Sequence, residues 1–163
     1  MNKDLMMSLV GKVIKIDRGG PESRVGMLLA AKDDYFVLFT KDDGFVYYKM
    51  QHIKSVTVDS KDSFSKEFEV LENMDYYQGE DFKSVISNFR HSWVKVNRGG
   101  PEKLEGILNE VEDDYVTIFS KQEVVQLAMF HIRNISFGEK DEEKEQNAKS
   151  NTSAKSVRGR KKA

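Results

Sequence analysis

The stretch "DRGGPESRVGMLLAAKDDYFVLFTK" spans residues 17–41, and "NRGGPEKLEGILNEVEDDYVTIFSK" repeats it at residues 97–121. The two stretches align at a constant offset of 80 residues, with about half of their positions identical. A period this long is typical of tandem copies of a compact module rather than of a solenoid repeat. The repeat therefore predicts a duplicated domain. Both copies begin at a corner that holds the only prolines of the chain: Arg18, Gly19, Gly20, Pro21 and Glu22, and then Arg98, Gly99, Gly100, Pro101 and Glu102.

Each copy reads as a series of short β-strands. Apolar Ile14 and Ile16 alternate with polar residues, as on a strand with one buried face. The runs "YFVLF" at 35–39 and "YVTIF" at 115–119 are rich in the aromatic and β-branched residues that favour strands. Five such segments in each copy predict a mainly β protein with two tandem SH3-like or Sm-like small five-stranded barrels, in which closure of the sheet removes exposed edges.

Other patterns set the boundaries of the modules. Apolar residues at helical spacing in 3–11 and 79–92 predict a short helix before each barrel, with Asp81 as an N-cap. The last 25 residues have too few apolar side chains to offset the entropy of ordering. We therefore expect a first barrel module at residues 1–58, a connector at 59–80, a second barrel module at 81–138 and a disordered charged tail at 139–163.

Charge is unevenly distributed along the chain. The 163 residues have a formal net charge of −1, and residues 139–163 carry eight basic and five acidic side chains, which leaves −4 for the residues before them. Only the tail therefore favours a polyanion without specific geometry. The chain has no cysteine, which excludes disulfides. The apolar stretch Leu5–Val10 is too short for a signal peptide or a membrane span, so we expect a soluble chain that is not exported.

The glycines of the corner raise the alternative of a phosphate-binding loop. Such a loop needs a helix after it and a Lys-Ser/Thr pair, whereas strand-like residues follow both corners. Pro21 and Pro101 also remove one backbone donor each. We therefore interpret the corner as a structural turn between the first two strands of each copy, in which glycine and proline supply the backbone angles.

No constellation of catalytic residues is apparent. His52 and His131 occupy equivalent positions, but neither has metal-ligand spacing to another histidine or to an acidic cluster. The Asp-Asp pairs at 33–34 and 113–114 precede tyrosines in what reads as a turn. No serine lies in a nucleophile-elbow pattern. We predict that the protein is not an enzyme and has no catalytic, cofactor-binding or metal site.

Adjacent tyrosines suggest a different class of function. Tyr47 and Tyr48 follow each other in a predicted strand, so one of them should face outward, where it could stack on a base. This favours the alternative of an Sm-like RNA-binding regulatory protein. The equivalent residues of the second copy are Gln126 and Leu127, however, and the predicted folded part is acidic. Both observations make nucleic acid an unfavoured partner.

The tail offers candidate phospho-acceptors. Hydroxyl side chains lie among lysines and arginines, and phosphate groups added there would meet nearby cations and change the charge of the tail. The alternative is an unmodified basic tail. The candidate acceptors are Ser150, Thr152, Ser153 and Ser156.

Several segments resemble the amino-terminal region of the spore coat protein B family of Bacillus-type endospore formers. They are "DRGGPES", "DDY" and "QHIKSV" in the first copy and "WVKVNRGGPEKLEGIL" and "FHIRNISFG" in the second. The resemblance implies a structural protein of the outer spore coat, made in the mother-cell cytoplasm, with no catalytic residues. It implies other spore coat proteins as partners, with self-association and a coat protein kinase acting on the tail as further partners. Two linked modules would raise avidity for such partners.

Overall fold

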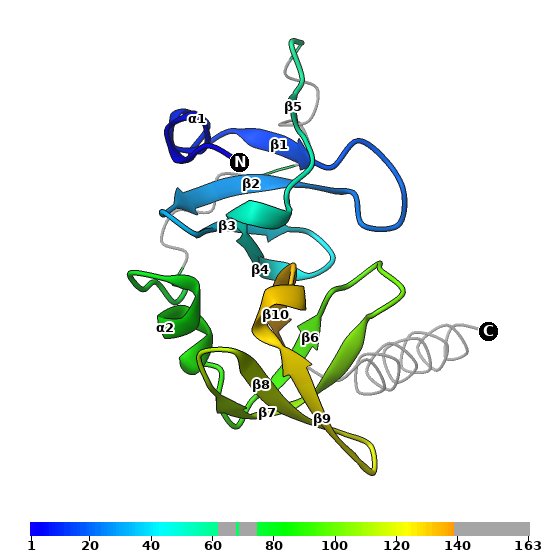
Figure 1. Cartoon of the computed structure of the whole chain (residues 1–163). Helices are drawn as coiled ribbons and strands as arrows, with labels where there is room; N and C mark the ends of the chain where they lie inside the picture. Colours follow the sequence, from blue (N-terminus) through cyan, green and yellow to red (C-terminus); the bar gives the residue numbers. More distant parts are fainter. Residues whose placement is uncertain (62–67, 69–74, 139–163) are drawn as a thin grey trace, which may run out of the picture.

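The structure is a computed structural model that describes residues 1–61, residue 68 and residues 75–138. Residues 1–61 form the first half and residues 75–138 the second half, and both halves repeat one order of elements (Figure 1). The first half contains α1 (Lys3–Ser8), β1 (Val13–Ile16), β2 (Arg24–Ala31), β3 (Tyr35–Thr40), β4 (Gly44–Lys49), the 3-10 turn η1 (Met50–His52) and β5 (Val56–Val58). The second half contains α2 (Phe82–Ser87), β6 (Trp93–Val96), β7 (Leu104–Val111), β8 (Tyr115–Ser120), β9 (Glu123–Ala128), the 3-10 turn η3 (Met129–His131) and β10 (Asn134–Phe137).

All ten strands belong to one antiparallel sheet with the order β5-β1-β2-β3-β4-β10-β6-β7-β8-β9. Each half contributes five neighbouring strands in the same internal order, and the pair β4–β10 joins the halves. The sheet consequently ends at β5 and at β9, which lie at opposite ends of the molecule in Figure 1. The predicted mainly β class is confirmed. Two separate barrels are not confirmed, because the strands form one continuous sheet.

Each half bends at a bulge in its long second strand. The register shifts after Leu28 in β2 and after Leu108 in β7, at equivalent positions. Gly26 and Gly106 precede these bulges, and a Cβ on either glycine would overlap a carbonyl oxygen of the neighbouring strand. Glycine therefore permits the close approach of backbones at the bend.

The two predicted helices are present and are capped by their own side chains. The carboxylate of Asp81 accepts a hydrogen bond from the backbone N–H of Ser84, whose hydroxyl accepts one from the N–H of Asp81. The side chain of Asn2 accepts hydrogen bonds from two backbone N–H groups of α1. These contacts satisfy donors that the first turn of a helix leaves free. No helix in the described part of the chain is long and apolar enough to cross a membrane.

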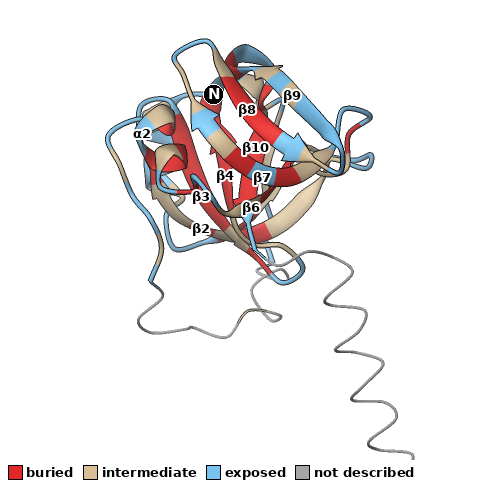
Figure 2. Cartoon of the chain, turned by 90° about the horizontal axis from the view of Figure 1, so that it is seen from below, coloured by how far each residue is buried: buried red, intermediate tan, exposed pale blue. Residues whose placement is uncertain are grey.

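The core consists of two apolar clusters that share the central strands. Along β3, Phe36 and Leu38 pack into the cluster of the first half, whereas Tyr35 and Val37 pack into the cluster of the second half. Tyr47 of β4 also joins the second cluster. Figure 2 shows buried residues concentrated in these central strands and exposed ones along β9. The central strands are thus buried on both faces, because the second half covers the face that a lone module would expose.

This arrangement corrects one expectation from the sequence. We expected either Tyr47 or Tyr48 to face outward, but both are buried, with exposed fractions of 0% and 3%. Tyr48 stacks on Phe36 inside the first cluster, at 5.1 Å between ring centroids. Tyr47 contacts Phe89 of the second half, at 5.1 Å. The prediction was wrong because alternation exposes one side of a strand only when nothing packs on that side.

Candidate interaction surface

The two halves meet first through backbone pairing. Ile135 in the middle of β10 lies opposite Tyr47 in the middle of β4, and the strands run antiparallel. Next to these pairs, the backbone N–H of Lys49 donates to the carbonyl oxygen of Arg133 at 2.9 Å. The contact therefore uses the fourth strand of one half and the fifth strand of the other. This joint shows which strand edges of the two halves pair with each other.

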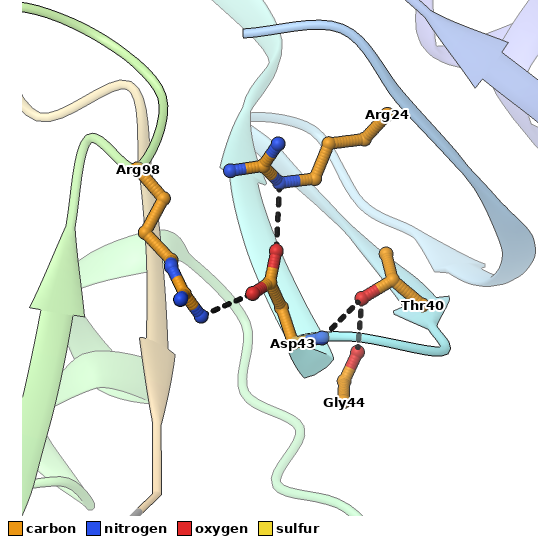
Figure 3. A network of polar contacts seen from close by, with 5 residues as sticks. All are labelled: Arg24, Thr40, Asp43, Gly44 and Arg98. Atoms are coloured by element: carbon orange, nitrogen blue, oxygen red, sulfur yellow. Dashed lines mark hydrogen bonds and ion pairs between the residues drawn. The ribbon is translucent and has the colours of Figure 1, made fainter. Parts of the chain in front are cut away.

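Ion pairs flank the paired strands. Asp43, in the turn before β4, forms an ion pair with Arg24 of its own half at 2.8 Å and accepts a hydrogen bond from Arg98 of the other half (Figure 3). The hydroxyl of Thr40 accepts from the N–H of Asp43 and donates to the carbonyl of Gly44, which fixes the turn. The Asp43 side chain is 7% exposed, so two arginines surround a largely desolvated carboxylate. Charge-assisted hydrogen bonds of this kind are strong and directional.

The Arg-Gly-Gly-Pro-Glu corners lie at this joint. The structure places the first corner between β1 and β2 and the second between β6 and β7. Glu22 of the first corner pairs with Arg133 of the second half. A Cβ on Gly99 would overlap the carbonyl oxygen of Pro21, and a Cβ on Gly100 would crowd the side chains of Glu22 and Arg133. The glycines of the second corner therefore let the two corners touch.

The glycines of the first corner have different surroundings. No atom lies within 4 Å of where a Cβ would stand on Gly19 or Gly20 among the described residues. Gly20 has a φ of +82°, a backbone conformation that favours glycine. In the second corner the positive φ falls instead on Gly99, at +84°. Both corners thus take part in the contact, the second through its glycines and the first through Pro21 and Glu22, and only the first is open on its glycine side.

Two residues just before the corners have roles that sequence reasoning missed. Asp17 and Asn97 both adopt positive φ, at 54° and 53°. The side chain of Asp17 accepts from the N–H of Lys54, and that of Asn97 accepts from the N–H of Arg133. Each corner is thereby tied to the segment before the fifth strand. An Asp or Asn at the same place in both copies was the available signal, since these residues tolerate positive φ.

The candidate catalytic and metal-binding groups have structural partners. His52 forms a 2.6 Å hydrogen bond with the carbonyl of Phe130 across the two halves. Asp33 pairs with Lys3, and at the equivalent place Asp113 pairs with Lys83, which ties each helix to its sheet. Within the ranges that the structure describes, no group of three histidine or acidic residues could hold a metal ion.

Lys49 is a cation whose pKa is shifted by burial. Burial lowers the pKa of its ammonium group, which donates to the carbonyl of Met129 and lies 5.2 Å from the ring centre of Phe82. A lysine in such a place can act as a nucleophile. Here its contacts join the first half to the second, and a structural role accounts for them.

An exposed apolar row lies on the second half. Ile107, Phe119 and Val124 are opposite one another on β7, β8 and β9, and they are 42%, 41% and 61% exposed. In the first half the equivalent of Val124 is Phe45, which stacks on Tyr76 of the connector at 5.4 Å. One end of the row is therefore packed against another ring in the first half, whereas all three residues are exposed in the second. An open apolar row beside a free strand edge is a candidate surface for a protein partner.

Comparison with known proteins identifies a relative whose name gives its location in the cell. The chain is 38% identical over 145 residues to spore coat protein B of Bacillus subtilis (strain 168), an alignment that covers 89% of this chain. The chain is therefore related to this spore coat protein B. It spans 37% of the length of that relative. No family model matches the chain, and no solved structure matches it.

The similarity to spore coat protein B supports a location in the spore coat. The alignment of 145 residues of this chain extends over both halves. The candidate phospho-acceptors Ser150, Thr152, Ser153 and Ser156 lie outside the residues that the structure describes.

Proposed function

We propose that this protein is a non-catalytic structural component of the spore coat, in which two linked β modules bind other coat proteins. The observation that carries the proposal is the extensive identity to spore coat protein B. The contacts of the candidate residues support it as well. Histidines, acidic residues and Lys49 pack helices and join the two halves, and apolar surface is left open on β7, β8 and β9.

In this proposal each half is one strongly bent, barrel-like module of the SH3 or Sm kind, at residues 1–58 and 81–138. The equal strand order, the equivalent bulges and the equivalent helix ties support that division. The pairing of β4 with β10 holds the modules in a fixed relative orientation. A second partner contact would therefore form intramolecularly after the first, which raises avidity without further chemistry.

The corners and the tail have separate roles in this proposal. Arg18–Glu22 and Arg98–Glu102 are structural turns that bring the modules together, and they bind no phosphate. The tail, residues 139–163, supplies electrostatic contacts to other coat components, and its serines and threonine are acceptors for a coat kinase. Added phosphates would reverse its net charge of +3.

RNA binding has less support than a coat role. The tyrosines that suggested base stacking are buried in the two core clusters. The residues before the tail carry a net charge of −4, which opposes a phosphate backbone. Filter binding to single-stranded RNA at two salt concentrations tests this alternative, since contact with phosphates gives a steep salt dependence.

Fractionation of purified spores tests the coat role. Immunoblots of coat extracts, run on a phosphate-affinity gel, should show the protein in the coat fraction and should resolve any phosphorylated species. A variant that lacks residues 139–163 should stay in the coat through its modules and lose any retarded band. Recovery of the full chain only from vegetative cytosol would contradict the proposed coat role.

A further inference from the structure

We propose that the free edge β9 of one molecule pairs with the free edge β5 of a second copy, in the arrangement that β4 and β10 already use inside the chain. The result is a head-to-tail assembly in which every contact between modules is equivalent. This inference specifies one partner for the proposed coat role. It is tested on purified protein, so its failure would leave the fractionation result standing.

The free edges are equivalents of the two strands that already pair. Within each half β9 corresponds to β4, and β5 corresponds to β10. The internal joint uses three opposed pairs centred on Ile135 and Tyr47, and β5 is long enough to form three. The corresponding central pair between two molecules would be Val56 and Gln126. A short fifth strand is therefore sufficient for this contact.

The backbone of β9 presents its amides outward in the required way. In the first half the N–H of Met50 points inward to Asp34, and the preceding N–H of Lys49 points outward to β10. In the second half the N–H of Met129 points inward to Asp114 in the same manner. Because amide direction alternates along a strand, the N–H of Ala128 points to the open edge. Ala128 is the equivalent of Lys49.

One ion pair of the internal joint has a counterpart between molecules. Arg133 before β10 pairs with Glu22 of the first corner. The equivalent residues are Lys54 before β5 and Glu102 of the second corner. Both are exposed, and neither has an ion-pair partner among the described residues. Lys54 and Glu102 therefore carry opposite charges that an equivalent contact between molecules would bring together.

A second ion pair of the internal joint also has oppositely charged residues near the equivalent positions of the free edges. Arg98 pairs with Asp43 in the turn before β4. The equivalent of Arg98 is Arg18, which is exposed, and Glu123, the exposed first residue of β9, lies next to the position that corresponds to Asp43. Complementary charge of this kind gives register and specificity to an interface.

The first corner has room for a partner's corner. Inside the molecule Pro21 and Glu22 fill the space beside Gly99, where a Cβ would overlap them. Beside the equivalent Gly19 the space is open. Pro101 of a second molecule would fill it in the proposed contact. This accounts for a glycine that, without positive φ or a close neighbour, has no structural reason inside one molecule.

Among the described residues, the β9 edge also lacks the usual protection against pairing. Edge strands of monomeric proteins are commonly blocked by proline, inward charges or a covering segment. The sequence of β9 is EVVQLA, which contains no proline and no lysine. Because the two edges differ, the contact is head-to-tail and leaves a free edge at each end. Assembly therefore continues to a closed ring or an open filament.

A proline at the free edge tests the pairing. Ala128 has a φ of −61°, which proline adopts without strain, and its N–H is the outward one. Purified full-length wild type should gain mass with concentration in sedimentation velocity, whereas Ala128→Pro should stay monomeric with an unchanged circular dichroism spectrum. Ala128→Val keeps the N–H and should assemble like the wild type. A wild type that is monomeric throughout, or an Ala128→Pro variant that assembles, would overturn the proposal.

Charge reversal tests which edges meet. Lys54→Glu and Glu102→Lys each place like charges at the proposed contact, so each variant alone should associate about tenfold more weakly at low salt. An equal mixture should regain wild-type assembly, because the glutamate introduced in the first variant then meets the lysine introduced in the second. The remaining contacts of the mixture join the unchanged Lys54 of the second variant to the unchanged Glu102 of the first. Both variants change exposed side chains only, so both should fold. A mixture that associates as weakly as its components would overturn the pairing of β5 with β9.

Discussion

Strands β4 and β9 hold the same place in the two halves but have opposite surroundings. Four of the six residues of β4 are buried, whereas no residue of β9 is. The difference arises because the second half adds β10 to the edge of β4, while nothing in the described structure is added to β9. The two halves therefore differ most where one covers the other. Substitutions at equivalent residues of the two halves measure that difference as a difference in stability.

The largest difference should appear at Tyr47 and its equivalent Gln126. Tyr47→Ala removes a ring packed between the halves and a hydroxyl that donates to the carbonyl of Tyr77, so it should cost about 4 kcal/mol. Gln126→Ala removes an exposed side chain that accepts from the Thr117 hydroxyl, and it should cost about 1 kcal/mol or less. Urea unfolding measures both. Equal losses would mean that the halves are not joined as described.

The corners give the next largest contrast. Gly99→Ala puts a Cβ where the carbonyl of Pro21 lies and strains a φ of +84°, so it should cost about 2–3 kcal/mol in thermal unfolding. Gly19→Ala at the equivalent place meets open space, and it should change stability by less than about 0.5 kcal/mol. A similar cost at both glycines would show that the pentapeptide has one role in both halves.

Much of the local structure could be predicted from the sequence. Strand and helix signals depend on residues a few positions apart, so alternation, helical spacing and the cap at Asp81 were sufficient for them. The mainly β class followed from these strand signals, whereas two separate barrels were not confirmed. The exposure of Tyr47 and Tyr48 was predicted wrongly because it depends on a neighbour distant in the chain.

The joint between the halves could not be predicted in the same way. Which sheet edges meet is decided by the shape of two complete modules, and no local pattern encodes it. Asp43, which links the halves through Arg98, lies in the one turn where the two copies differ in length. Such departures from the repeat were the available signal. They mark residues that contribute to the contact between the halves rather than to the fold of one half.

The helix caps give a smaller contrast that depends on pH. Hydrogen bonds from Ser84 hold the pKa of the Asp81 carboxyl below its ordinary value of 3.8, so its stabilisation is present above that value and is lost as pH falls through the lowered pKa. Asp81→Ala should cost about 1 kcal/mol at pH 7 and progressively less below pH 3.8. Asn2→Ala removes a cap that does not titrate, so its cost should stay constant over the same range. Parallel pH profiles in urea unfolding would contradict this assignment.

The smallest effect concerns the hydroxyl groups of the adjacent tyrosines. The Tyr48 hydroxyl is buried without a hydrogen-bond partner in the described part of the chain, whereas the Tyr47 hydroxyl donates to the carbonyl of Tyr77 at 2.8 Å. Burial raises the pKa of both groups, so both are neutral near pH 7. An unpaired buried hydroxyl costs free energy, so Tyr48→Phe should leave stability unchanged or raise it by up to about 1 kcal/mol. Tyr47→Phe should lower it by about 1 kcal/mol, because the carbonyl of Tyr77 loses its donor. Since both substitutions keep the ring and its packing, opposite signs in urea unfolding would assign the difference to the hydroxyls alone, and a loss at Tyr48 would mean that a partner occupies that site.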